Sequence, residues 1–298
     1  MSGLYHEIDP SGDVVLGLSA QRRSPAETQE AEEELYNPEH VFSAVEVSQT
    51  CFKVSCFKVS SKHLILASKY FKDHFKKHCD PGAFLLVMNI IHGKNQEIPK
   101  EEGEAMLLKV ADVACYLDCR EACMFVVELW IERLCFEGKI RYNTWENCLK
   151  WAYLSWAFNL PSEFTTSTSA AMGLRSVTSK YPANLKLPEL IKADITEGRS
   201  NACRKAQSIL LPETTRLKSA TVHCRFTCDS LHLGAILKAT GDLKQSPLLL
   251  VNARLQSKVT HCTAAKPDCV NMADLLELKA AFGFACQGEG LILKNYIE

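Results

Sequence analysis

The stretch FKVSSKHLILASKYFKDHF, residues 57–75, changes from strand patterning to helix patterning within a few positions. Phe57 and the valine two positions later share a face, as alternate side chains of a strand do. Ser60 or Ser61 is expected to cap a short helix over KHLILA, because a serine there accepts a hydrogen bond from the first turn. Ser68 is expected to cap a second helix, in which two phenylalanines four residues apart lie on one face. The stretch therefore predicts a strand that leads directly into two short helices.

The same strand region contains a duplication, CFKVSCFKVS at residues 51–60. A strand alternates faces every two residues, so a repeat of five places the apolar residues of the second copy on the opposite face. A bulge or a register change near Ser55 and Cys56 would resolve this conflict. We expect the second copy to be the strand that enters the helices and the first copy to be a local duplication.

The overall composition is that of an ordinary globular protein. The 298 residues are 47% hydrophobic and 23% charged, which suits a chain that buries a full core in two domains. A net charge of -1 gives no reason to expect a nucleic acid or a membrane surface as a partner. Fourteen cysteines in a chain without an apolar leader favour reduced thiols, so we expect an intracellular protein of the cytoplasm or nucleus.

Patterning along the chain predicts two domains, at residues 1–140 and 141–298. The first contains a weak strand at 11–19, a polar loop at about 21–40 and then amphipathic helices. The second is expected to be entirely helical, with a linker near 212–220.

Two apolar stripes at helical spacing mark the later helices of the first domain. Gly93 stands where a left-handed residue would end the helix before them. Asp118 is expected to cap the helix that carries the second stripe. The first stripe comprises Leu107, Val110, Ala114 and Leu117, and the second comprises Ala122, Phe125, Val126 and Leu129.

The usual motifs of catalysis are missing from the sequence. It contains no GxxxxGK[ST] phosphate loop, no HExxH zinc helix and no GxSxG nucleophile elbow. Nine histidines and fourteen cysteines produce Cys/His pairs by chance, so such a pair does not by itself indicate a catalytic dyad. We therefore expect a protein that is not an enzyme.

Cysteines and histidines gather in two segments of the second domain, HCRFTCDSLH at 223–232 and HCTAAKPDC at 261–269. A tetrahedral zinc site takes four cysteine or histidine ligands, and two short segments of this kind contain enough of them. Their spacing is not the tight C-x2-C of zinc ribbons and fingers, and free cysteines are common in protein cores, so a purely structural role stays open. The candidate zinc ligands are Cys224, Cys228, His261 and Cys262.

The stretch 57–75 resembles the signature of BTB/POZ domains: a strand ending in an aromatic residue and a valine, a histidine, a short apolar helix, then a serine and an aromatic pair. Weaker matches over most of the chain resemble one subgroup, the fungal BTB domain proteins. Among them are HEIDPSGDVVL at 6–16 and LKWAYLSWAFNLPSEF at 149–164. The motif residues, all expected to be structural, are Phe57, Val59, His63, Leu64, Leu66, Ser68, Tyr70 and Phe71. His63 is expected to bond a backbone carbonyl.

The resemblance implies an α+β fold that is predominantly helical, with a small BTB-type sheet flanked by helices and an all-α C-terminal region. The sequence departs from the family where only CDPG, residues 79–82, separates two helices, because a BTB sheet strand normally lies there. We therefore expect a shortened sheet.

In function, the resemblance implies a protein–protein interaction module or scaffold that forms a homodimer, or an adaptor for a cullin ubiquitin ligase. The missing strand belongs to the part of the fold that usually contacts a cullin, which favours self-association. The alternative is a zinc-stabilised helical protein of transcription, dimerised by its BTB part. Apart from that zinc ion, no cofactor is expected.

Overall fold

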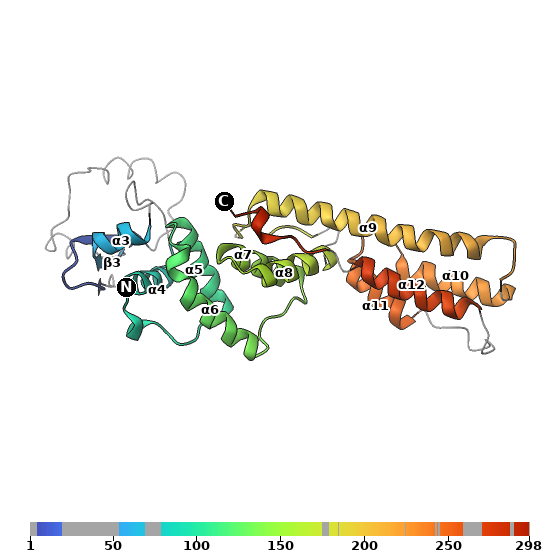
Figure 1. Ribbon diagram of the computed structural model, residues 1–298, viewed down its shortest axis with the longest axis horizontal. Helices are drawn as coiled ribbons and strands as arrows, with labels where there is room; N and C mark the ends of the chain where they lie inside the picture. The colour runs from blue at the N-terminus through green and yellow to red at the C-terminus, as the bar shows by residue number, and fades with distance from the viewer. Residues whose placement is uncertain are drawn as a thin grey trace. The chain divides into compact units, whose positions relative to one another are not determined.

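The computed structural model describes residues 5–19, 54–68, 79–174, 179–183, 185–223, 225–241, 243, 245–258, 270–286 and 289–297. The chain divides into two compact units, Met1–Lys139 and Ile140–Glu298, which we describe one at a time. Helices predominate in both, and the strands of the described residues form one small sheet in the first unit (Figure 1). The α+β, mostly helical fold class predicted from the sequence is confirmed.

The sheet of the first unit has its last strand in the middle, in the order β1-β3-β2. The central strand pairs with β1 in parallel and with β2 in antiparallel orientation. The strands are β1 Tyr5–Glu7, β2 Val14–Ser19 and β3 Val54–Val59.

The register between β2 and β3 runs without interruption and places Leu16 opposite Phe57 and Gly17 opposite Cys56. The bulge predicted near Ser55 and Cys56 is therefore wrong. Cys56 and Phe57 point to opposite faces of β3, and both are buried. Because apolar residues are accommodated on both faces of the strand, the five-residue repeat needs no bulge. The strand consequently includes the end of the first CFKVS copy as well as the second copy.

The chain crosses the end of β3 on its way from β1 to β2. The backbone N–H groups of Ile8 and Asp9 donate to the Lys58 carbonyl oxygen at 3.0 and 3.1 Å. A Cβ atom on Gly12 would lie 2.6 Å from the Val59 carbonyl oxygen, so only glycine fits this crossing.

Two helices follow the sheet, α3 (Ser61–Ala67) and α4 (Pro81–Ile91). The rings of Phe57 and Phe84 lie 4.9 Å apart, which packs α4 against the central strand. The predicted loss of a BTB sheet strand before α4 stays a prediction, because residues 69–78 lie outside the described residues. Gly93 has φ +64°, the left-handed conformation expected after this helix.

A short 3-10 helix and two long helices complete the first unit. The stripe predicted for the first long helix is correct, because all four of its residues are buried. Asp118 does not cap the second long helix as predicted: it has φ +49°, and Cys119 is the residue at the N-cap position. The elements are η2 Asn95–Glu97, α5 Glu104–Tyr116 and α6 Arg120–Phe136.

The face of α6 that packs into the unit is not the one predicted from its periodicity. In the predicted stripe, Phe125 and Leu129 are 71% and 48% exposed. The helix has apolar residues on two sides, and Trp130 directs the other side inward, where its ring N–H donates to the Pro99 carbonyl oxygen at 2.8 Å. The residues of α6 that are buried are Cys123, Val127, Trp130, Ile131 and Leu134.

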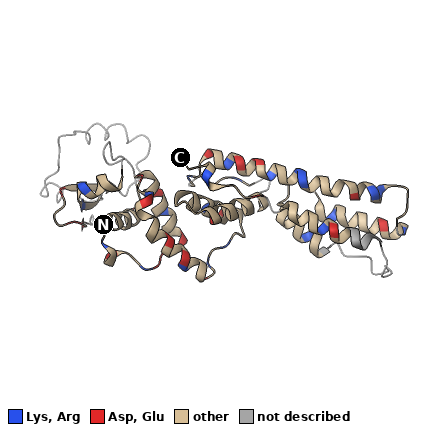
Figure 2. Ribbon diagram, in the orientation of Figure 1, with Lys and Arg blue, Asp and Glu red and all other residues tan. Residues whose placement is uncertain are grey.

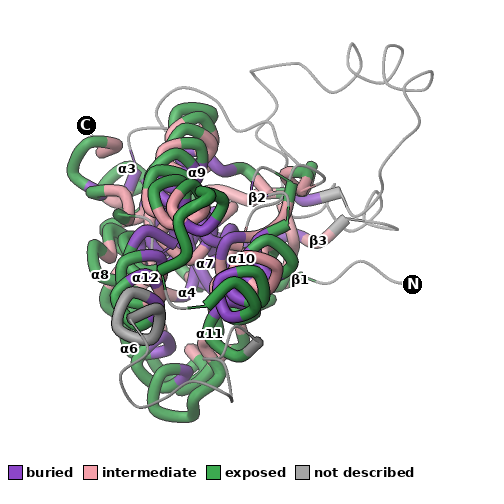
Figure 3. Tube along the Cα trace, turned by 90° about the vertical axis from the view of Figure 1, so that its right-hand side faces the viewer, coloured by how far each residue is buried: buried purple, intermediate pink, exposed green. Residues whose placement is uncertain are grey.

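All the secondary-structure elements described in the second unit are helices. Its first helix, α7, is buried along most of its length, as its nearly uniform apolar sequence predicts (Figure 3). The chain ends in an extended segment with a single 3-10 turn. The helices are α7 Trp145–Ala157, α8 Pro161–Leu174, α9 Glu189–Lys218, α10 Phe226–Thr240, α11 Leu248–Lys258, α12 Val270–Cys286 and η3 Leu293–Asn295.

The linker predicted near 212–220 is wrong, because α9 continues through Pro212 to Lys218. Pro212 interrupts one backbone hydrogen bond of the helix without ending it. Leu210 and Leu217 are both buried on the flanks of the proline, so packing holds the helix together there.

A buried arginine holds the loop between α10 and α11 against α9. Arg199 is only 5% exposed, and its guanidinium donates to the carbonyl oxygens of Leu243, at 2.9 Å, and Ser246. Backbone carbonyls facing a cation in this way offset part of the cost of burying its charge. None of the helices in the described part of the chain is long and apolar enough to cross a bilayer.

Candidate functional site

The motif at residues 57–71, which resembles that of BTB domains, begins where β3 passes into α3. Phe57 and Val59 are fully buried, and Leu64 is 3% exposed. Burial of these three apolar side chains stabilises the junction by the hydrophobic effect, at about 1.5–3 kcal/mol for each side chain. Their position gives them a structural function.

The later residues of the motif lie at the end of α3. Leu66 is 88% exposed, so it does not belong to the core. Ser68 is buried, and its hydroxyl donates to the carbonyl oxygen of Leu117. Tyr70 and Phe71, together with the second helix predicted after Ser68, lie outside the described residues.

The first turn of α3 is held by a residue that the sequence did not point to. Asp13, next to β2, accepts hydrogen bonds from the Ser61 N–H at 2.8 Å and from the Ser61 hydroxyl at 2.6 Å. These bonds hold the pKa of the Asp13 carboxyl below its usual value. Ser60 occupies the N-cap position, as predicted, but the predicted capping hydrogen bond of its side chain is absent. No local pattern would reveal this contact, because the two residues are 48 positions apart.

A histidine outside the motif makes the carbonyl bond that was expected of His63. The Nδ1–H of His92 donates to the Met88 carbonyl oxygen at 2.8 Å, and its Nε2 accepts from the Ser60 N–H at 3.0 Å. Burial lowers the pKa of His92, so the ring is neutral at physiological pH. His63 is exposed, and its ring lies 4.9 Å from that of His92.

Asp9, His63 and His92 form a cluster with the residue types of a metal site. One potential ligand atom from each lies within 4.8 Å of the others. Both ring nitrogens of His92 are already hydrogen-bonded, however, and Oδ1 of Asp9 accepts from the N–H and the hydroxyl of Ser11. A metal ion would have to displace the Ser60 N–H from His92, so these residues do not fit one.

Helix α6 presents a second apolar face, which we call the α6 outer face: Phe125, Leu129, Glu132 and Phe136. These positions are spaced by four, three and four residues and therefore line up along one side of the helix. Phe136 is 91% exposed, more than either other apolar member. Large apolar side chains aligned on one exposed face mark an interaction surface more often than isolated ones do.

Strand β2 is an edge of the sheet. Among the described residues, β3 is the only strand that pairs with it. Its sequence, VVLGLS, has neither a charged residue nor a proline, which are the usual protections of an edge strand. The outer backbone groups of β2 are therefore suited to pair with another strand.

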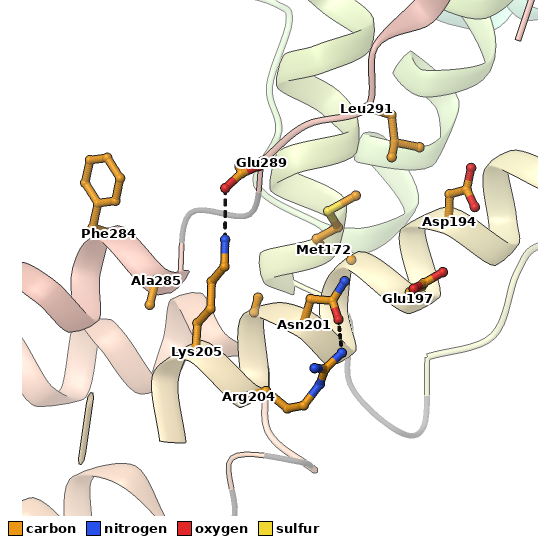
Figure 4. Close-up of a pocket in the computed structure, with 12 residues that line it drawn as sticks. Met172, Asp194, Glu197, Asn201, Arg204, Lys205, Phe284, Ala285, Glu289 and Leu291 are labelled. Atoms are coloured by element: carbon orange, nitrogen blue, oxygen red, sulfur yellow. Dashed lines mark hydrogen bonds and ion pairs between the residues drawn. The ribbon is translucent and has the colours of Figure 1, made fainter. Parts of the chain in front are cut away.

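The second unit has an open pocket of about 500 Å³ among α8, α9, α12 and the C-terminal segment (Figure 4). Its two basic groups are engaged with neighbours: Lys205 pairs with Glu289 at 2.9 Å, and Arg204 donates to Asn201. The side chains drawn in Figure 4 do not form a nucleophile with a base beside it. The pocket offers no basis for a catalytic assignment.

The C-terminal segment lies across α8 and closes one side of this pocket. The Leu291 N–H donates to the Thr168 hydroxyl at 2.9 Å, and the Thr165 hydroxyl donates to the Leu291 carbonyl oxygen at 3.0 Å. The Tyr296 hydroxyl donates to Asp194 on α9. Burial and this contact raise the pKa of Tyr296, which keeps its hydroxyl protonated.

The described cysteines whose pKa values are shifted are not suited to act as nucleophiles. Burial raises the pKa of Cys148 and of Cys286 to about 12. The hydrogen bond with Cys123, together with burial, raises the pKa of Cys119 as well. Such thiols carry almost no thiolate, the nucleophilic form, at neutral pH.

Only one of the four candidate zinc ligands lies among the described residues. Cys228 is buried in α10. Cys224, His261 and Cys262 lie outside the described residues, so the zinc alternative stays a prediction from sequence.

No family model, no curated protein and no solved structure matches the chain.

Proposed function

We propose that the chain is a non-catalytic protein–protein interaction module of the BTB type, which self-associates through its N-terminal unit. The observation that carries the proposal is the outer edge of β2, six residues without a charge or a proline. Among the partners that the BTB resemblance implies, we choose a second copy rather than a cullin, because an edge strand is complementary to itself.

That self-complementarity follows from the geometry of antiparallel pairing. Two copies of one edge strand related by a two-fold axis pair with identical backbone groups on both sides. The two three-stranded sheets would then continue into each other. Ile65 and Leu66 on α3, 47% and 88% exposed, add apolar surface to the same unit.

The test adds a charge to β2 without disturbing its pairing with β3. Val15 lies opposite Lys58, on the face of the sheet that does not carry Phe57. Val15→Glu would form an opposite-charge pair with Lys58 within the chain, but would place a carboxylate on each side of the contact between copies. We expect light scattering to give a lower molar mass for this variant than for the unchanged protein.

Val15→Thr is the matched control, because threonine keeps the branched shape and the strand preference of valine without a charge. It should leave the molar mass unchanged. Equal masses for the Glu and Thr variants, with unchanged circular dichroism, would rule out pairing through β2.

A further inference from the structure

The α6 outer face carries three exposed apolar side chains along one side of the helix. Phe125 and Phe136 are separated by eleven residues, about 16 Å along the helix axis. Leu129 lies between them, and these three side chains are 71%, 91% and 48% exposed. The opposite side of α6 is fixed in the core through Trp130, so the helix cannot rotate to bury the outer face. A single stripe of this width suits one helix of a partner.

Three carboxylates lie on or beside this face. Glu132 lies within the stripe, Glu128 lies beside Leu129, and Glu121 lies one turn before Phe125. No described residue forms an ion pair with any of these three carboxylates, and Figure 2 shows acidic positions recurring along α6.

The basic residues nearest in sequence do not neutralise the face. Arg133 is held by Glu101 and Glu137, both at 3.1 Å, and Lys139 is held by Glu137 at 2.7 Å. The α6 outer face therefore combines an apolar stripe with uncompensated negative charge.

We propose that the α6 outer face binds a basic amphipathic helix of another protein, with apolar residues on one side and lysine or arginine along its border. Apolar residues of that helix pack on Phe125, Leu129 and Phe136, and its cations pair with Glu128 and Glu132. A second copy of this chain is not the occupant, because it would place the same carboxylates against one another. The inference rests on the proposed function as an interaction module, but it uses a different surface from β2.

The probe is a labelled peptide of about 18 residues, five helical turns, composed of leucine on one face and lysine on the other. Its twin carries glutamate in place of lysine. We expect fluorescence anisotropy to show binding of the lysine peptide to the full chain and none of the glutamate peptide. Phe125→Ser should weaken binding by about tenfold or more, as loss of a central aromatic anchor does. Leu190→Ser, at a leucine of α9 that is 72% exposed, is the control and should leave binding unchanged.

A charge exchange tests the electrostatic part separately. The double variant Glu128→Lys, Glu132→Lys replaces one pair of like charges on the helix by another, so it should fold as the unchanged protein does. This double variant should no longer bind the lysine peptide and should bind the glutamate peptide instead. An unchanged peptide preference would overturn the proposal, and so would a Phe125→Ser variant that binds as well as Leu190→Ser does.

The two proposals fail in distinguishable ways. If Phe125→Ser converts a dimer to a monomer, the α6 outer face binds a second copy and the basic-helix proposal is wrong. If Val15→Glu has no effect on molar mass while the peptide results hold, the β2 proposal alone is wrong.

Discussion

His92 fixes the junction between β3 and α3 through both nitrogens of its ring. One nitrogen donates to the Met88 carbonyl oxygen in α4, the helix that ends just before His92. The other accepts from the Ser60 N–H at the start of α3. Only the neutral ring can do both, because a protonated imidazole has no acceptor. The stability of the first unit is therefore linked to the protonation of this residue.

The stability of the N-terminal unit should fall as the pH drops below the ordinary histidine pKa of about 6.5. The pKa of His92 is lowered in the fold, chiefly by burial, so the unfolded chain binds the proton more readily in this range. The loss of stability should develop between the ordinary pKa of His92 in the unfolded chain and its lower pKa in the folded chain. It should level off below the folded-state pKa. Urea unfolding of the N-terminal unit, followed between about pH 5 and 8, measures it.

His92→Gln supplies the control, because glutamine keeps a donor and an acceptor but does not titrate. It should flatten the dependence on pH, whereas His63→Gln at the exposed neighbour should keep it. The same slope in His92→Gln as in the unchanged protein would contradict this account.

Gly290 allows the C-terminal segment to lie directly on α8. A Cβ atom at this position would lie 2.0 Å from the Thr165 carbonyl oxygen, which belongs to the helix backbone and cannot move aside. We expect Gly290→Ala to lower the free energy of unfolding by about 1–3 kcal/mol, the usual cost of overpacking. Thermal unfolding measures this change.

Gly234, inside α10, is the matched control because a Cβ atom there meets nothing within 4 Å. Gly234→Ala should raise stability by up to about 1 kcal/mol, since alanine has the higher helix propensity. Equal effects of the two substitutions would show that the segment is not in close contact with α8.

At the scale of residues, the sequence predicted contacts between neighbours in the chain better than contacts between distant ones. Gly93 was identified because a left-handed residue follows a helix at a regular place. Asp13 and His92 were missed, because each bonds the start of α3 from more than thirty residues away. Apolar spacing does not report such polar pairings.

Among the elements, α6 shows the limit of periodicity as a guide to burial. A repeat of 3.6 residues predicts a helix, but a helix with apolar residues on two sides offers two candidate buried faces. The sequence favoured the face with Phe125 and Leu129, whereas the fold buries the one with Trp130. The choice depends on the neighbouring α4 and α5, which the spacing within α6 does not describe.

Substitutions on the two faces of α6 should differ strongly in their effect on stability. Trp130→Ala should cost about 3–5 kcal/mol of the free energy of unfolding, as the loss of a buried aromatic side chain does. Leu129→Ala should change it by no more than about 0.5 kcal/mol, because leucine 129 is half exposed and the two residues have similar helix propensities. Denaturant unfolding of both variants measures the difference, and similar losses would contradict the orientation of α6.

Helix α9 occupies most of the predicted linker near 212–220, although proline usually ends a helix. Burial of Leu210 and Leu217 on either side of Pro212 favours continuation. The packing of α9 against α8, α10 and α12 therefore outweighs the local cost of the proline.

For the whole molecule, the sequence predicted the fold class but neither of the two candidate surfaces. The resemblance to BTB domains, together with a strand pattern followed by many amphipathic stretches, predicted a small sheet with mostly helical structure. The exposed edge of β2 and the α6 outer face depend on what the rest of the chain leaves uncovered. Exposure of this kind follows from packing, so it could be identified only in the folded chain.

The central claim, self-association of the N-terminal unit, is tested most directly by the molar mass of the purified full chain. Light scattering after gel filtration, in reducing buffer and over a series of protein concentrations, gives this mass without a partner or a label. We predict twice the 33.3 kDa of one chain, with dissociation only on dilution. A mass of 33.3 kDa at every concentration would contradict the account.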